Sequence, residues 1–337
     1  MRKSVAAGAV AKGIALAAVV VSGLGVASFG AAPAEAAPSC RGDRITVADL
    51  TSGCEVSSGT VVLADGRRFA VPAAGTTVSA LPVAATGAVD PGDVSITNTG
   101  RNGLAVLVDH AWSGAPRAVR QERSAAARRG SAATLHGTAS GAGTTTNANA
   151  PSSCSNTTYT KLGYRWTGPV NWSYNPAGQR VSGAAAINAG ADAWTGAITA
   201  CGRKTTTTAS ERMIGTTTQS PGVTSAGGCG ASSGASVVGW GSLKAGTLAV
   251  TCVWSRSGTA VEVDQRYTMA QQWSATTTCS GARFDLRGVA THEWGHAFGL
   301  GHTVQTSGLV MKPASTTCET GQRTLGFGDL RGIDALY

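Results

Sequence analysis

Apolar residues form one long continuous run near the start of the 337-residue chain, at residues 13–29. Positively charged residues precede this run, and residues 34–36 follow it with the small-x-small pattern that signal peptidase cleaves. A run of about 17 residues rich in glycine is short for a transmembrane helix. We therefore predict that residues 1–36 are a signal peptide, and that the protein is secreted and extracellular, without a stable membrane association.

The hydrophobic pattern changes after the predicted cleavage site. Short β-branched runs separated by turn residues are typical of strands, and they lie at residues 45–47, 61–63, 68–71 and 104–108. Asp65-Gly66 between the second and third runs is a hairpin signal. Residues 37–112 are therefore predicted to form a small β-rich N-terminal region.

Aromatic residues mark a boundary further along the chain. Fifteen of the 18 Trp, Tyr and Phe residues follow residue 153, and none lies between Trp112 and Tyr159. The segment between is rich in Ala, Gly, Ser and Thr and carries five arginines, a composition typical of a flexible linker. Residues 113–153 are predicted to be this linker, and residues 154–337 a separate, aromatic-rich domain.

The arginine-rich linker suggests a role for the region that precedes it. Exposed flexible segments are where proteases cut. We therefore expect the β-rich region to be a propeptide that is removed, which would make the protein a zymogen. The alternative is a binding module that the mature protein retains.

Charge and cysteine content narrow the class of protein. The formal net charge of +9 is shared between the two halves of the chain, without a dense basic cluster, so a nucleic-acid partner is not expected. Eight cysteines without a Cys-x-x-Cys pair favour disulfides in an exported protein. Cys40 and Cys54 are expected to pair, and the connectivity of the other six stays open.

Three of the five histidines lie within residues 286–302. His292 and His296 are four residues apart, so a helix would project both imidazoles from the same face. Gly299 can adopt the positive φ that ends a helix and brings His302 round as a third ligand. Three protein ligands leave the fourth position of a tetrahedral zinc ion open, which is typical of a catalytic site. We predict one catalytic Zn²⁺ held by these histidines.

The residue next to the first histidine completes this chemistry. Glu293 can reach a water on the metal without binding the metal itself, so we predict that it is the general base. Asp285 is expected to cap the helix. The two other histidines, His110 and His136, have no partners in sequence and are expected at the surface.

The motif HExxHxxGxxH at residues 292–302, followed by Met311, resembles the metzincin zinc endopeptidases. Thr303 after the last histidine and Pro313 two residues after the methionine resemble the matrixins, the peptidase family of the matrix metalloproteinases. The resemblance implies an α+β fold, with a zincin-like catalytic domain that contains a twisted sheet and an active-site helix.

The likeness extends beyond the motif to most of residues 154–337. It covers a first strand, a first helix, an edge strand above the cleft and a closing helix, at residues 164–174, 184–195, 246–250 and 329–337. Substrate is expected to lie extended along residues 246–250 by β-augmentation.

The sequence also departs from the family pattern. Residues 154–337 contain no histidine outside the motif, so a second, structural zinc site cannot be built from histidine. Calcium sites could be built from its nine carboxylates, but nothing in the sequence supports one. Residues 38–42 faintly resemble the matrixin segment in which a cysteine blocks the zinc, although a disulfide of Cys40 with Cys54 is favoured over such a thiol.

These observations favour a secreted zinc-dependent endopeptidase that acts as a monomer on protein or peptide substrates. Two alternatives stay open: a binding protein on an inactive zincin scaffold, and a zinc hydrolase of cell-wall peptides. The presence of Glu293 argues against an inactive binding protein, because a site that has lost its activity need not keep its general base. The sequence does not define the cleavage specificity or the mechanism of latency.

Overall fold

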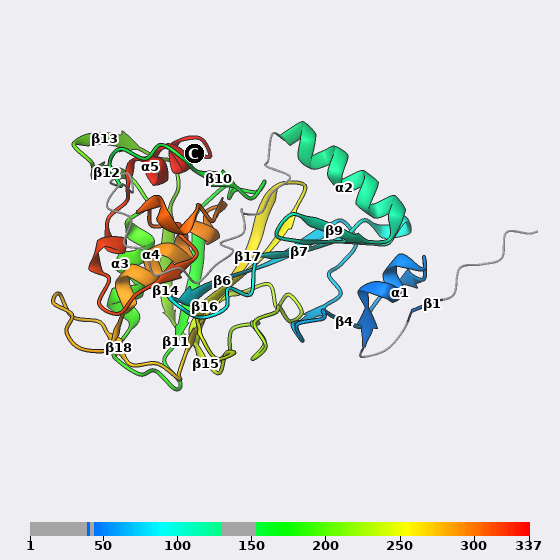
Figure 1. Ribbon diagram of the computed structural model, residues 1–337, viewed down its shortest axis with the longest axis horizontal. Coiled ribbons are helices and arrows are strands. Elements are labelled where there is room, and N and C mark those ends of the chain that lie inside the picture. Colours follow the sequence, from blue (N-terminus) through cyan, green and yellow to red (C-terminus); the bar gives the residue numbers. More distant parts are fainter. Residues whose placement is uncertain (1–38, 41–43, 130–152) are drawn as a thin grey trace, which may run out of the picture. The chain divides into compact units, whose positions relative to one another are not determined.

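A computed structural model describes residues 39–40, 44–129 and 153–337 of the chain (Figure 1). The predicted signal peptide, residues 1–36, lies outside the described residues, and so does His136. Within them, no helix is long and apolar enough to cross a membrane.

The largest sheet contains ten strands in the order β14-β11-β15-β17-β16-β6-β7-β8-β9, with β21 paired to β6 beside this path. Its strands are β6 (Thr76–Ala85), β7 (Val94–Asn98), β8 (Leu104–Val108), β9 (Ala111–Gly114), β11 (Val170–Asn175), β14 (Glu211–Thr216), β15 (Ser236–Gly241), β16 (Thr247–Arg256), β17 (Thr259–Thr268) and β21 (Ala314–Ser315). Neighbours are parallel from β14 to β17 and antiparallel from β17 to β9. Figure 1 shows β17, β16 and β6 side by side.

Five helices and several short strands complete the described fold. The helices are α1 (Val47–Thr51), α2 (Pro116–Arg129), α3 (Ala184–Asp192), α4 (Leu286–Ala297) and α5 (Phe327–Asp334). The short strands are β1 (Ser39–Cys40), β2 (Ile45–Thr46), β3 (Glu55–Val56), β4 (Thr60–Val62), β5 (Arg68–Ala70), β10 (Thr160–Lys161), β12 (Ala197–Ala200), β13 (Arg203–Thr206), β18 (Trp273–Ser274), β19 (Phe284–Asp285) and β20 (Leu300–Gly301). The predicted α+β class is confirmed.

Strand β16 separates two hydrophobic cores. Side chains alternate between the two faces of a strand. Ala249 and Val253 belong to the core that also contains α3 and α4, whereas Val250, Cys252 and Trp254 belong to a second core with the N-terminal strands. Because the two regions share one sheet and this second core, Ala37–Tyr337 forms a single compact unit.

The predicted strands of the N-terminal region are present, and β4 and β5 form the antiparallel hairpin expected at Asp65-Gly66. The linker prediction is wrong over Pro116–Arg129, which forms helix α2. Proline is well placed as the first residue of a helix, and Ala, Arg, Gln and Glu are strong helix formers. The helix packs through Ala118 against Ala105 of β8, with Trp112 and Val119 partly buried beside them, so small side chains form the centre of this contact.

All eight cysteines are paired in disulfides. The predicted bridge Cys40–Cys54 is confirmed. The remaining connectivity is Cys154–Cys201, Cys229–Cys252 and Cys279–Cys318. Cys252 lies on β16, so its bridge to Cys229 fixes this strand to the loop between β14 and β15.

Helix α3 approaches the active-site helix α4 closely at Gly190. A Cβ atom at this position would lie 2.7 Å from the backbone nitrogen of Thr291 and 2.8 Å from the carbonyl carbon of Ala290. Any larger residue would therefore push α3 away from the helix that carries the histidines.

We predict that Gly190→Ala lowers the thermal unfolding midpoint of the protein. Overpacking costs about 1–3 kcal/mol, which exceeds the ~1 kcal/mol that alanine gains over glycine within a helix. Exposed Gly168 provides the control, because a Cβ there would meet no described atom within 4 Å. An unfolding midpoint for Gly190→Ala at or above that of Gly168→Ala would contradict this packing.

Candidate metal centre

Helix α4 begins where the sequence predicts. The Asp285 side chain accepts a hydrogen bond from the backbone N–H of Gly288 at 2.7 Å, and Arg323 Nε donates to the same carboxylate at 2.8 Å. Apart from Arg287, every residue of the helix is buried. The helix therefore lies in the core, and its histidines are held in a water-poor environment.

The chain turns sharply after α4 because Gly299 has a φ of 105°. A Cβ atom at Gly299 would collide with the carbonyl oxygen of Tyr164, so a glycine is required both for the conformation and for the close approach. The turn leads through β20 to His302, as predicted.

The three predicted histidines lie together. Nε2 of His302 is 3.1 Å from Nε2 of His292 and 3.1 Å from Nε2 of His296. Nδ1 of His292 lies 2.8 Å from the carbonyl oxygen of Val310, and Nδ1 of His296 lies 2.8 Å from that of Leu300. These carbonyls accept the Nδ1 protons, so that both Nε2 lone pairs are available to a metal. Burial also lowers the pKa of both imidazoles, which keeps them neutral.

Glu293 is fully buried beside the histidines. Its Oε2 accepts a hydrogen bond of 2.5 Å from the hydroxyl of Thr251 on β16, while Oε1 has no hydrogen-bond partner among the described residues. Burial raises the pKa of Glu293 to about 8. No sequence signal marks Thr251, because it lies 42 residues before Glu293 with no motif around it.

A carboxylate from the N-terminal region also reaches the site. Asp93 precedes β7, is 1% exposed, and places Oδ1 at 3.2 Å from Nδ1 of His302. Burial, the largest single influence, lowers the pKa of His302, but the interactions with Asp93 and the charges of Asp90 and Glu293 together outweigh it and raise that pKa. No sequence signal marks Asp93, because it lies about 200 residues before the histidines in a turn between two predicted strands.

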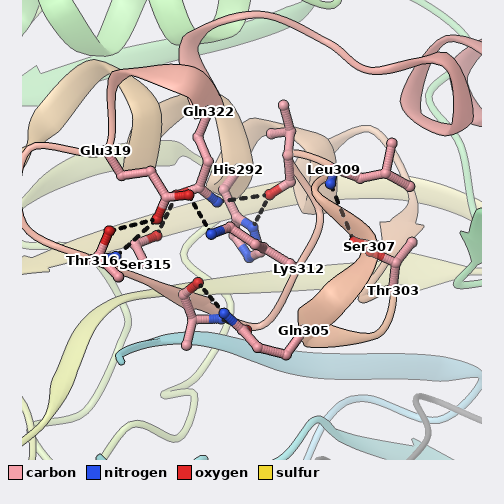
Figure 2. Close-up of polar contacts among 12 residues, drawn as sticks. His292, Thr303, Gln305, Ser307, Leu309, Lys312, Ser315, Thr316, Glu319 and Gln322 are labelled. Atoms are coloured by element: carbon pink, nitrogen blue, oxygen red, sulfur yellow. Dashed lines mark hydrogen bonds and ion pairs between the residues drawn. The ribbon is translucent and has the colours of Figure 1, made fainter. Parts of the chain in front are cut away.

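A network of hydrogen bonds holds the segment after His302 beneath the site (Figure 2). Gln322 donates to the same Val310 carbonyl that faces His292, at 3.0 Å. Thr303 donates its backbone N–H to the carbonyl of Met311 at 2.8 Å. A Cβ atom at Gly295 would lie 2.2 Å from the sulfur of Met311, so the methionine packs directly against α4.

Strand β6 occupies the edge of β16 that was predicted to bind substrate. Leu81 is paired with Thr251, and Val83 with Ala249. On its other edge, the end of β6 pairs in parallel with β21 just after Met311. The expectation of an exposed edge strand is therefore wrong for this form of the chain, since an N-terminal strand lies between β16 and the Met311 segment.

The residues fit a divalent metal ion that accepts nitrogen ligands. The three Nε2 atoms form the one group of metal-ligating side chains found in the described part of the chain. Oε1 of Glu293 is also buried, without a hydrogen-bond partner among the described residues. Three converging imidazole nitrogens suit Zn²⁺. Nothing in these residues supports a calcium site.

The comparison with known families agrees with this geometry. Residues 244–337 match the family model of the matrixins, and this segment contains the three histidines, Glu293 and Met311. The predicted resemblance is thus confirmed, and the family together with the histidine site supports a zinc metallopeptidase. No curated protein matches the chain.

Asp329 supports the same segment from helix α5. Its Oδ2 accepts hydrogen bonds from the backbone N–H groups of Val310 at 3.0 Å and Gly326 at 2.7 Å. Burial raises the pKa of this carboxyl to about 6. Asp329 therefore fixes the backbone whose carbonyl orients His292.

We predict that Asp329→Ala destabilises the protein and lowers its zinc content. Two buried N–H donors would lose their acceptor, at a cost of about 1–3 kcal/mol each. Chemical unfolding and metal analysis of the purified protein would measure both effects. Asp334→Ala, an exposed position on the same helix, is the control. Equal stability of the two variants would show that Asp329 does not support the site.

Proposed function

We propose that this protein is a secreted zinc endopeptidase made as a zymogen. The observation that carries the proposal is the convergence of His292, His296 and His302 beside a buried Glu293, in a segment that matches the matrixins. The four disulfides agree with an oxidising, extracellular location.

The three histidines would hold the zinc ion, which when bound supplies Lewis-acid polarisation and a water of lowered pKa. Glu293 accepts a proton from the attacking water and later donates it to the nitrogen of the leaving amine. The Thr251 hydroxyl holds Oε2 of Glu293, which leaves Oε1 as the oxygen that carries the proton.

Substrate binding follows from the position of β16. An extended peptide can add to the edge of this strand through backbone hydrogen bonds, which hold it in register whatever its sequence. In the full chain β6 already makes these hydrogen bonds. Peptide binding therefore requires that β6 leave the cleft, which supports a propeptide role for residues 37–112.

The general base can be tested with Glu293→Gln. We expect the variant to keep its zinc, because the three histidines are unchanged, and to lose at least about 100-fold in casein hydrolysis. The controls are the unmodified enzyme with a chelator, which should abolish hydrolysis, and the same sample after zinc is restored. Full activity of Glu293→Gln would refute the mechanism. Cleavage of peptidoglycan fragments but not of casein would identify cell-wall peptides as the substrate.

Removal of the N-terminal region predicts a particular mature terminus. N-terminal sequencing of the active protein from the culture medium should find a start between Ser113 and Cys154, because cleavage there breaks the covalent link between β6 and the metal-site region and allows β6 to dissociate. Active protein that begins near Ala37 would show that the region is retained as a module.

A further inference from the structure

The N-terminal region holds the middle of one loop of the metal-site region, residues 154–337. This loop, residues 217–235, connects β14 to β15 and lies outside the helices and strands of the described fold. The backbone N–H of Ala70 on β5 donates to the carbonyl of Cys229 in the loop at 2.9 Å. A Cβ atom at Gly228 would lie 2.2 Å from the carbonyl oxygen of Arg68, so the backbones of the loop and of β5 are in direct contact.

The two ends of the loop are held differently, by side chains of the metal-site region itself. Asp264 on β17 accepts a hydrogen bond from the backbone N–H of Gly222 at 2.7 Å. Glu262 on the same strand accepts one from the backbone N–H of Gly234 at 2.9 Å. The ends therefore need no help from the N-terminal region, whereas the central part that carries Cys229 is positioned by it.

The partner of Cys229 in the disulfide is covered by the same N-terminal strands. Cys252 on β16 is paired with Ala80 of β6, and Trp254 on β16 is paired with Val78. Both cysteines are fully buried in the second core, to which the N-terminal strands contribute most of the side chains. Strand β5 thus places one cysteine of the bridge, and β6 covers the other.

Formation of this bridge is difficult without the N-terminal strands. The apolar side chains of Val223, Val250 and Trp254 would lose the core in which they are buried. The two cysteines are 23 residues apart, so they would have to meet by closure of a flexible loop, which costs conformational entropy. A folded N-terminal region removes this cost before the bridge forms.

We propose that the N-terminal region is a folding template for the metal-site region. Its strands β5 and β6 bring Cys229 and Cys252 together, and the bridge then keeps the loop on β16 after the N-terminal region has left. This function of residues 37–112 is separate from the peptidase activity proposed above and does not depend on it.

The oxidant for the bridge is an external disulfide such as glutathione disulfide. One cysteine thiolate attacks this disulfide, forms a mixed disulfide and releases one glutathione thiolate. The second cysteine thiolate attacks the mixed disulfide and releases the other. The two cysteines are oxidised, the external disulfide is reduced, and the two thiol protons end on the released glutathione.

Oxidative refolding of the full-length chain tests the template. Glu293→Gln serves as the parent, so that the chain is not cleaved, and either Val78→Asp or Val119→Asp is added to it. Val78→Asp places a carboxylate opposite Trp254 in the second core. Val119→Asp is the matched control, because Val119 belongs to the separate cluster between α2 and β8. Reduced chains are diluted into glutathione buffer, alkylated at timed points and analysed for all four bridges by peptide mass spectrometry.

We expect Val78→Asp to slow formation of Cys229–Cys252 by at least about tenfold, because burial of an unpaired charge costs more than the ~1.4 kcal/mol that a factor of ten represents. This holds whether or not the N-terminal region itself folds in the variant, since either way the template is lost. Cys154–Cys201 and Cys279–Cys318 should form at the parent rate, because the second core contains none of these four cysteines. All bridges of the control should do so as well.

Three results would overturn the template. They are an unchanged rate of Cys229–Cys252 formation in Val78→Asp, equal slowing of all three bridges of the metal-site region, and equal slowing of Cys229–Cys252 in Val119→Asp.

A variant on the other side of the contact leaves the N-terminal sequence unchanged. Gly228→Ala pushes the loop away from Arg68 and should also slow the formation of Cys229–Cys252, with the other three bridges unaffected. Gly168→Ala is the control, since a Cβ there meets no described atom within 4 Å. Formation of Cys229–Cys252 at the same rate in both variants would show that contact with β5 does not place Cys229.

Discussion

The pairing of β6 with β16 is the interaction on which the rest of the structure depends. It joins the N-terminal strands to the strands of the metal-site region in one sheet and covers the edge of β16 next to the histidines. The chain then continues from β6 into the turn that contains Asp93. The same β16 supplies Thr251 to Glu293, so a single strand holds the Glu293 carboxylate through a side chain and is covered by β6 along its edge.

The parts of the site that the sequence predicts correctly are those set by local geometry. The Asp285 cap, the one-turn spacing of His292 and His296, and the turn at Gly299 are each determined within a few residues. Thr251 and Asp93 reach the site only through long-range strand pairing, for which a single sequence gives no local signal. Their carboxylate and hydroxyl groups are also among the commonest in proteins, so neither stands out as chemistry.

Helix α2 shows a different reason for a wrong prediction. A lack of aromatic residues predicted a segment outside the core, but α2 packs mainly through alanines, and its arginines give the segment a hydrophilic average. Intrinsic helix propensity, which depends on alanine and on straight side chains, would have been the better guide. The strands of the N-terminal region were easier to predict, because their β-branched runs are bounded by turn residues.

Cutting the chain does not by itself open the site. Val250 and Trp254 on the second face of β16 are buried in a core shared with N-terminal residues such as Val78 and Ile96. A cut between the two regions leaves this core, the β6–β16 hydrogen bonds and the Asp93 contact in place. Exposing two such side chains to water opposes separation, since burial of each contributes about 1.5–3 kcal/mol. Activation of the proposed zymogen would therefore require dissociation of the N-terminal region after cleavage, and the shared core would determine how slowly that dissociation occurs.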